Sequence, residues 1–289
     1  MKETVKKYFG NWYIECDPDD GARIQVLKYA GKDLLTVKPE IFKTPAKFTG
    51  EYENRPVYGY DDCFPTVDPC TYPGKPDICR DHGELCWQQW KVEVNDNKLI
   101  FETDCLRPYV KFRRILEFDG SKLLWKFEVL NLTDEKIIFL HVMHALLPLQ
   151  NIQKLKIPEH GRIIDEIHSK ELVLENAQDL VSDLFNIKAG DYKMLLLSKL
   201  KSNKIRVGFD NGLALSITFD KEIFPTLGIW WNNAGYPEEE GLERIECAFE
   251  PIPGSCSDLS KSFSDGIFLE TDPGKSFSWE ISWEVESKE

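Results

Sequence analysis

Apolar and polar residues alternate along much of this chain, as they do in β-strands that bury one face. The clearest case lies near the C-terminal end, where Phe277, Trp279, Ile281, Trp283 and Val285 are separated by single Ser or Glu residues. Further strand-length runs cover residues 90–94, 99–103, 110–118, 123–129, 204–209, 213–219 and 226–231, and several are separated by Asn-Asp, Asp-Gly or Asn-Gly pairs. Such short turns predict antiparallel pairing between neighbouring strands.

Helical spacing is rare by comparison. We predict one helix, over residues 170–185, where Leu174, Ala177, Val181 and Leu184 are three or four positions apart. Residues 39–80 hold seven of the sixteen prolines and predict a long irregular excursion, not a strand pair. No repeat of about 20 to 50 residues and no break in composition divides the chain. The pattern predicts an all-β fold, one large antiparallel β-sandwich domain over residues 1–289 with few short helices.

Composition and charge limit the partners. The chain has 36 Lys and Arg residues against 49 Asp and Glu residues, a formal net charge of −13. This charge disfavours nucleic acid and anionic membranes and favours a small neutral ligand. No apolar stretch approaches the roughly 20 residues that span a bilayer, so we do not expect a membrane protein. Because no apolar run follows the charged residues 2–7, we expect a cytoplasmic location.

Eight cysteines raise the question of a metal site. Cys63, Cys70, Cys79 and Cys86 share one stretch, but the gaps between them are six, eight and six residues. Structural zinc sites use much shorter pairs of the form C-x₂-C. We therefore expect reduced thiols that bind no metal and form no disulfide framework, with a zinc site as the less favoured alternative.

Three of the five histidines are candidate site residues. His141 and His144 lie in the apolar run 137–147, which predicts a strand covered on both faces. An offset of three places their rings on opposite faces, so only one can face a given site and the other is a core histidine. His82 follows Asp81 after the long excursion. It either faces a pocket or belongs to a surface turn.

Glu250 is the most suggestive carboxylate. It ends the strand-like run 245–250, shares a face with Glu246 and Ala248, and precedes a proline. Partial burial there would raise its pKa toward the range of a general base, whereas an exposed strand end is the alternative.

An aromatic and amide cluster follows a similar logic. Trp230 and Trp231 are adjacent, so one lies on each face of their strand, and Asn232 follows them. Indole rings cover the C–H faces of sugars, and an amide both donates to and accepts from hydroxyl groups. Core packing accounts for one of the two tryptophans.

Taken in order, these segments resemble the galactose mutarotase-like superfamily, which contains the aldose 1-epimerases. The resemblance is carried by Gly21-Ala22-Arg23-Ile24, residues 59–67 with Asp81-His82-Gly83-Glu84-Leu85, the strand containing His144, Glu250-Pro251, and Pro273-Gly274-Lys275. These segments cover nearly the whole chain.

The resemblance implies a supersandwich whose concave face binds a monosaccharide or sugar derivative, and mutarotation without a cofactor. In that reaction a carboxylate takes the proton of the anomeric hydroxyl while an imidazolium protonates the ring oxygen. Glu250 would be the base and His144 the acid, and His82 would bind the ring oxygen or a neighbouring hydroxyl. Asp61, Trp230 and Asn232 would contribute to the sugar-binding surface.

Several alternatives stay open on the sequence alone. His141 competes with His144 for the role of acid. A non-catalytic carbohydrate-binding protein is a second candidate, because the early sugar-binding Arg of the family has no clear counterpart. A lyase or hydrolase is a third, but a hydrolase needs two facing carboxylates and only Glu250 is well placed. The identity of the sugar, its phosphorylation and the oligomeric state are not predicted.

Overall fold

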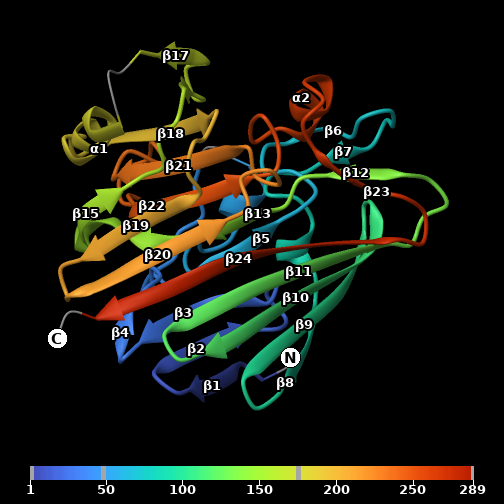
Figure 1. Ribbon diagram of the computed structural model, residues 1–289, viewed down its shortest axis with the longest axis horizontal. Coiled ribbons are helices and arrows are strands. Elements are labelled where there is room, and N and C mark those ends of the chain that lie inside the picture. The colour runs from blue at the N-terminus through green and yellow to red at the C-terminus, as the bar shows by residue number, and fades with distance from the viewer. Residues whose placement is uncertain (1–2, 47–49, 174–176, 288–289) are drawn as a thin grey trace.

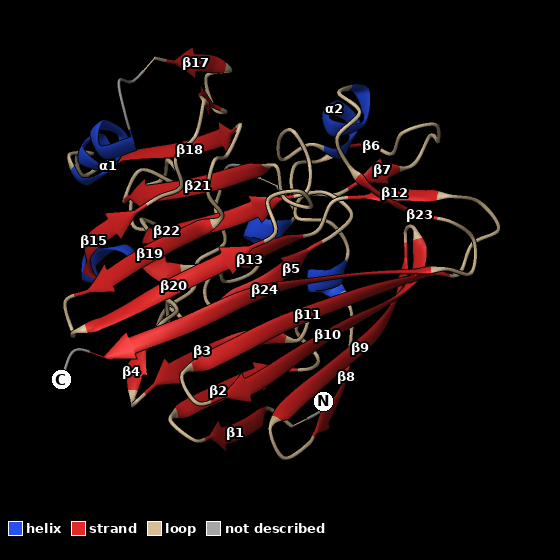
Figure 2. Ribbon diagram, viewed as in Figure 1, coloured by secondary structure: helices blue, strands red, loops and turns tan. Residues whose placement is uncertain are grey.

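The computed structural model describes residues 3–46, 50–173 and 177–287, and it consists mainly of antiparallel strands (Figures 1 and 2). The longest sheet has eight strands in the order β15-β19-β20-β24-β11-β10-β9-β8. Its strands are β8 (Lys91–Val94), β9 (Lys98–Leu106), β10 (Tyr109–Asp119), β11 (Lys122–Asn131), β15 (Ile152–Lys156), β19 (Lys204–Phe209), β20 (Leu213–Phe219) and β24 (Ser276–Ser287). The strands predicted from alternation in these regions are confirmed.

Two six-stranded sheets lie against this one. The first contains β1 (Val5–Phe9), β2 (Trp12–Asp17), β3 (Arg23–Tyr29), β4 (Lys32–Asp33), β5 (Tyr60–Cys63) and β13 (Val142–Ala145). The second contains β14 (Leu147–Pro148), β16 (Arg162–Asp165), β17 (Lys170–Leu172), β18 (Asp191–Ser198), β21 (Thr226–Asn233) and β22 (Ile245–Ile252). Because β13 lies beside β22, the two sheets continue one another across the molecule (Figure 1).

The main core fills the space between these sheets. In β11 every second residue is buried, from Leu123 to Asn131, as the alternation predicts. The ring of Tyr60 in β5 packs on Trp125 in β11, with centroids 4.7 Å apart, and Trp125 also packs on Trp283 in β24. The expected large antiparallel β-sandwich is therefore confirmed.

Helices are few and short among the described residues. They are α1 (Ala177–Phe185), α2 (Leu259–Ser264) and the 3₁₀ turns η1 (Tyr52–Asn54), η2 (Leu85–Trp87) and η3 (Leu149–Asn151). The helix predicted over residues 170–185 is wrong in its first part, because β17 pairs there with β16. Leu174 lies outside the described residues. Leu180, Val181 and Leu184 form the buried side of α1.

The long excursion is more ordered than its prolines predict. It contains β5, which is buried at every residue and pairs with β13, so this central strand was missed. It also contains a short strand pair, β6 (Cys70–Thr71) with β7 (Ile78–Cys79), which corrects the expectation of no strand pair. The run 137–147 divides into β12 (Ile137–Phe139), which pairs with β23 (Leu269–Thr271), then β13 and β14. The chain thus changes sheets between Phe139 and Val142.

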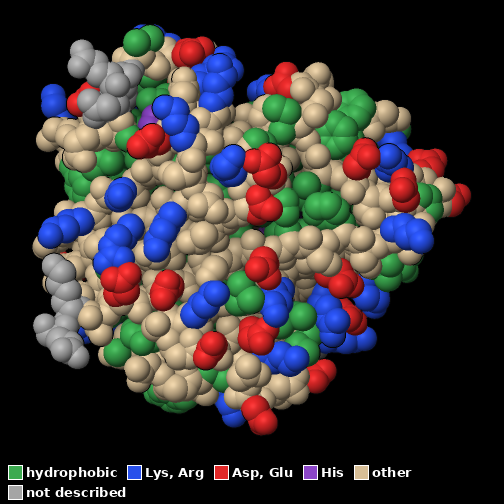
Figure 3. All heavy atoms as spheres, viewed as in Figure 1, with side chains coloured by type: hydrophobic (Ala, Val, Ile, Leu, Met, Phe, Trp, Pro, Cys, Tyr) green, Lys and Arg blue, Asp and Glu red, His purple; other side chains and the backbone are tan. Residues whose placement is uncertain are grey.

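The surface and the thiols add little to this picture. On the face seen in Figure 3, Lys and Arg side chains are interspersed with Asp and Glu side chains. Within the described ranges, no helix has both the length and the apolar character to cross a membrane. The cytoplasmic location stays a prediction. All eight cysteines are free thiols, and Cys70 faces Cys79 across β6 and β7.

Candidate functional site

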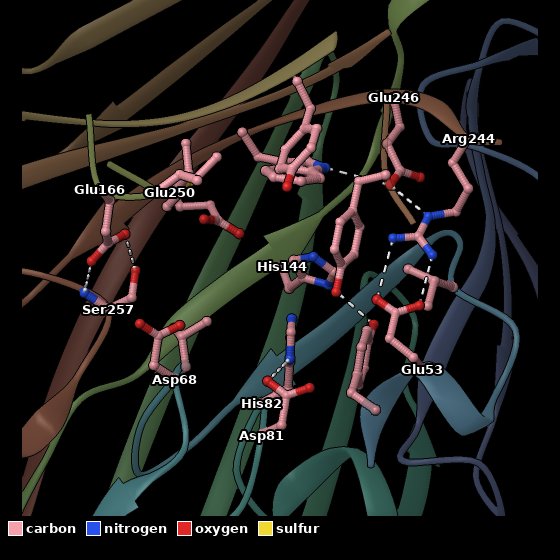
Figure 4. A pocket seen from close by; sticks show the side chains of 18 of the residues that line it. Glu53, Asp68, Asp81, His82, His144, Glu166, Arg244, Glu246, Glu250 and Ser257 are labelled. Carbon is pink, nitrogen blue, oxygen red and sulfur yellow. Dashed lines mark hydrogen bonds and ion pairs between the residues drawn. The ribbon is translucent and has the colours of Figure 1, made fainter. Parts of the chain in front are cut away.

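A cavity of about 380 Å³ lies on the side of β13, β18, β21 and β22 that faces away from the main core. Its lining includes Tyr52, Glu53, Asp68, Asp81, His82, His144, Glu166, Tyr192, Trp230, Tyr236, Arg244, Glu246, Glu250 and Ser257. Figure 4 shows His82 and His144 near the middle, with Asp68, Glu166 and Glu250 on one side and Arg244, Glu53 and Glu246 on the other.

Strand parity decides which side chains reach the cavity. In β22, Glu246 and Glu250 line the cavity, while the intervening Cys247 and Phe249 belong to the main core. In β21, Trp230 lines the cavity and Trp231 is buried in the core. The predicted division of the two tryptophans is therefore confirmed, and Glu250 shares a face with Glu246 as expected.

His144 is held by a chain of buried polar groups. It lies opposite Asp61 in the pairing of β13 with β5. The hydroxyl of Tyr52 donates to Asp61 Oδ2 at 2.7 Å and lies 3.1 Å from Nδ1 of His144. Because the hydroxyl has one hydrogen, which goes to the carboxylate, Nδ1 of His144 carries a proton and donates to Tyr52. In the neutral ring, Nε2 then has a free lone pair.

The surroundings of His144 favour its neutral form. Burial lowers the pKa of His144 well below its usual value, and the positive charges of His82 and Arg244 lower it further. Asp61 does not offset this effect, because its carboxylate is already paired with Arg23 at 3.0 Å and with Arg55 at 3.5 Å. At neutral pH the His144 ring is therefore neutral, and its Nε2 atom can accept a hydrogen bond from a ligand.

His82 has the opposite tendency. It adopts the left-handed backbone region, and its ring stacks on Tyr52 with centroids 3.8 Å apart. Burial alone lowers the pKa of His82, but the hydrogen bond from Nδ1 to Asp81 at 2.8 Å and the charges of Asp81 and Glu250 raise it overall. Of the two cavity histidines, His82 is the one that more readily carries a positive charge.

Glu250 is buried without a direct partner. Its residue exposure is 3%, and within the described residues its carboxyl group makes no hydrogen bond or ion pair. Burial raises the pKa of Glu250 to about 7, and the charges of Glu166 and Asp68 contribute to this rise, whereas His82 opposes it. A carboxyl group with a pKa near neutrality can both take and give a proton at physiological pH.

Two further carboxylates, missed in the sequence, border Glu250. Glu166 follows β16, and its two oxygens accept from the backbone N–H and the hydroxyl of Ser257 at 3.0 and 2.8 Å. Burial, followed by the charge of Glu166, raises the pKa of Asp68 to about 6. Both residues lie in irregular segments, where alternation carries no information about direction.

Arg244 closes the other side of the cavity and was also missed. Its guanidinium donates to Glu53 at 2.8 Å and to Glu246 at 2.9 Å, and it lies 5.4 Å from the ring centroid of Tyr236. Trp230 packs edge-on against Tyr236, with its indole N–H 3.4 Å from Glu246. This network neutralises the arginine and fixes the aromatic part of the wall.

The structure brings four of the six predicted site residues to the cavity, namely His82, His144, Trp230 and Glu250. Asp61 and Asn232 do not line it, which corrects their expected direct contact with a sugar. Tyr52 stands between Asp61 and the cavity. The Asn232 carboxamide is bound to the backbone of Gly235 and Tyr236, where it holds a turn.

His141 lies in the core, not in the cavity. Its Nε2 is 3.0 Å from Asp62, and its Nδ1 accepts from the indole N–H of Trp279 at 3.3 Å. Burial lowers the pKa of His141. The two histidines thus face opposite sides, as their offset predicts, and the core histidine is satisfied by side chains.

No group of three His, Cys, Asp or Glu side chains within the described residues is arranged to hold a metal ion. No family model matches the chain, and neither does any curated protein.

Solved structures, in contrast, resemble it over its whole length. A Synechocystis sp. PCC 6803 protein superimposes with a TM-score of 0.77 at 16% identity, covering 100% of this chain and 97% of its own. A galactose mutarotase related enzyme from Lactobacillus acidophilus gives 0.66 at 18% identity, covering 99% and 98%. A galactose mutarotase-like protein from Clostridium acetobutylicum gives 0.70 at 15% identity, covering 99% and 95%. The chain therefore has the galactose mutarotase-like sandwich fold.

Proposed function

We propose that this protein is an aldose 1-epimerase-like isomerase, which interconverts the α and β anomers of an aldose without a cofactor. One observation carries the proposal: His144 and Glu250, two buried titratable side chains on strands that lie side by side, line the same cavity. Ring opening needs one group that takes a proton and one that gives a proton, on either side of a sugar ring.

The residues act as follows. Glu250 takes the proton of the anomeric hydroxyl while His144 protonates the ring oxygen, and the ring opens. After rotation about the bond to the carbonyl carbon, the proton on Glu250 returns to the carbonyl oxygen, His144 takes back its proton, and the ring closes on the other face. His82 donates from Nε2 to a sugar hydroxyl, because its Nδ1 is held by Asp81.

The pKa values of the pair are compatible with this exchange. Besides the proton on Nδ1 of His144, the reaction needs one proton that is shared between Glu250 and Nε2 of His144. Burial raises the pKa of Glu250 to about 7 and lowers the pKa of His144, so near neutral pH this proton resides on Glu250. That arrangement is the one required for ring closure, and ring opening uses the same proton on His144. Both arrangements therefore belong to one protonation state of the enzyme.

The cavity also suits a sugar ring by its surface. The rings of Trp230, Tyr192 and Tyr236 pack against one another with centroids 5.4–5.6 Å apart. Such aromatic surfaces cover the apolar C–H faces of sugars, while the carboxylates and histidines opposite them bind hydroxyl groups.

Polarimetry tests the proposal. A freshly dissolved α-aldose approaches its anomeric equilibrium slowly in buffer, and the protein should accelerate this decay for at least one sugar among a series of hexoses and pentoses. If none is accelerated, the enzymatic proposal fails.

A non-catalytic carbohydrate-binding protein is the second candidate. The neutral form of His144 favours it, because Nε2 of the neutral ring carries no proton and is an acceptor for a sugar hydroxyl, not an acid. Binding measured by calorimetry without any acceleration of mutarotation would establish this alternative.

A further inference from the structure

The charged side chains that line the cavity are mostly acidic. Six of its lining residues are Asp or Glu, and the one Lys or Arg among the described lining residues is Arg244. The guanidinium of Arg244 is already bound by Glu53 and Glu246. Its charge is therefore not available to a ligand, and the rest of the cavity is acidic.

The excess charge is concentrated on the side formed by Asp68, Glu166 and Glu250, which we call the acidic wall. These residues come from three separate segments, and Figure 4 shows their carboxyl groups facing a common space. Glu166 is bound by Ser257, but Asp68 and the buried Glu250 have no hydrogen bond or ion pair to their side chains among the described residues. Both therefore retain free acceptor oxygens toward the cavity.

Two cations lie near Asp68, and neither neutralises the wall. The His82 ring is already paired with Asp81. The side chain of Lys261 is exposed, and its ammonium group lies 3.8 Å from Asp258. Besides burial, the charges of Glu166 and Asp68 raise the pKa of Glu250, and the charge of Glu166 raises the pKa of Asp68, so the carboxylates of the wall repel one another. A positively charged group of a ligand in this space would relieve that repulsion, whereas a phosphate or carboxylate would increase it.

The proposed reaction indicates which carbon of the ligand would carry the positively charged group. This step rests on the proposed function: if Glu250 contacts the anomeric oxygen, the substituent on C2 is next to it and meets the same wall. We propose that the acidic wall is a subsite for a protonated amino group on C2, so that the preferred ligand is a 2-amino-2-deoxyaldose and sugar phosphates are excluded.

Calorimetry at about pH 6 provides the test, because a sugar amine with a pKa near that of an α-amino group, about 8, is then protonated. Glucosamine and glucose differ by an ammonium group in place of a hydroxyl, and glucose 6-phosphate supplies the opposite charge. We expect glucosamine to bind roughly tenfold to a hundredfold more tightly than glucose, as for a hydrogen bond to a charged group. Glucose 6-phosphate should bind most weakly.

Two variants separate the wall from the overall charge. Asp68→Asn keeps the shape of the side chain and should remove most of the preference for glucosamine over glucose. Asp119→Asn removes the same charge from the exposed end of β10 and should leave the preference unchanged. Binding of glucosamine should also release protons from the wall, seen as a dependence of the binding enthalpy on the ionisation enthalpy of the buffer.

Equal affinity for glucosamine and glucose, an unchanged preference in Asp68→Asn, or tighter binding of glucose 6-phosphate would each overturn the subsite. These outcomes do not depend on turnover. A preference for glucosamine without accelerated mutarotation would leave the subsite standing and remove the proposed epimerase activity.

Discussion

At the scale of single residues, the proposed reaction depends most on Glu250, the general base in the cavity. Replacing it by Gln keeps the size of the side chain but removes its ability to accept a proton. We expect Glu250→Gln to lower mutarotase activity by about 10²–10⁴-fold, the usual contribution of a general base, while sugar binding is retained. Polarimetry and calorimetry measure the two effects separately. Glu280→Gln, at an exposed position of β24 outside the cavity, is the matched control and should leave the rate within about tenfold, since the usual catalytic contribution is far larger.

The raised pKa of Glu250 also predicts a pH effect on stability. At pH values below 4.5 the carboxyl group is protonated in both the folded and the unfolded chain. As the pH rises toward 7, the unfolded chain releases this proton while the folded chain holds it, so the free energy of unfolding falls, by about 3 kcal/mol in all. Urea unfolding should show Glu250→Gln gaining stability relative to the natural protein as pH rises through this range. A pH-independent difference would contradict this assignment.

The two histidines of the 137–147 run should respond differently to substitution. His141→Asn removes a buried donor from Asp62 and should cost about 1–3 kcal/mol of stability. His144→Asn should instead remove most mutarotase activity at a smaller cost in stability. Thermal unfolding and polarimetry on both variants give the comparison. An inactive but fully stable His141→Asn protein would reverse the two roles.

Strand parity explains which of these residues could be predicted. Alternation predicted that Trp230 and Trp231 lie on opposite faces, and likewise His141 and His144, because side-chain direction in a strand depends on position alone. Which member of each pair faces the cavity, together with Glu250, was learned from the structure. Alternation could not reveal that Tyr52 comes between Asp61 and the cavity, since that contact joins β5 to the 3₁₀ turn η1, where alternation carries no information.

At the scale of elements, the loop that carries Asp81 and His82 depends on a close backbone contact. Gly83 has a φ of +69°, and a Cβ atom there would overlap the backbone of Phe64. Gly83→Ala should therefore destabilise the protein by more than the roughly 1 kcal/mol of a simple left-handed glycine, and it should displace His82 and weaken sugar binding. Gly120→Ala is the control, with a φ of +56° and open space around it. Equal losses of stability in the two variants would rule out the contact.

The elements that were mispredicted share a cause. Residues 170–172 have helical spacing with the positions that follow, yet they form β17 because an edge of β16 is available for pairing. Tyr60–Cys63 lies among prolines and glycines, yet it forms β5 because β3 and β13 border it. In both cases a partner distant in sequence overrides the local signal. Asp68, Glu166 and Arg244 reach the cavity from loops, and no periodic pattern predicts the direction of loop side chains.

At the scale of the whole molecule, the core argues for a single folding unit. One continuous cluster joins Trp12 in β2, Trp125 in β11, Phe249 in β22 and Trp283 in β24. We propose that residues 1–289 form one domain and expect one cooperative transition on unfolding, with coincident curves from circular dichroism and tryptophan fluorescence. Two separate transitions would instead indicate two domains.

The position of β24 has a consequence for how the protein is made. This strand lies in the middle of the eight-stranded sheet, between β20 and β11, although it is the last strand in the chain. Until it leaves the ribosome, a nascent chain has two unpaired strand edges facing each other across an open slot, and such edges recruit other chains. Residues 276–287 therefore complete the eight-stranded sheet, and the nascent chain needs protection from aggregation until this segment has been made.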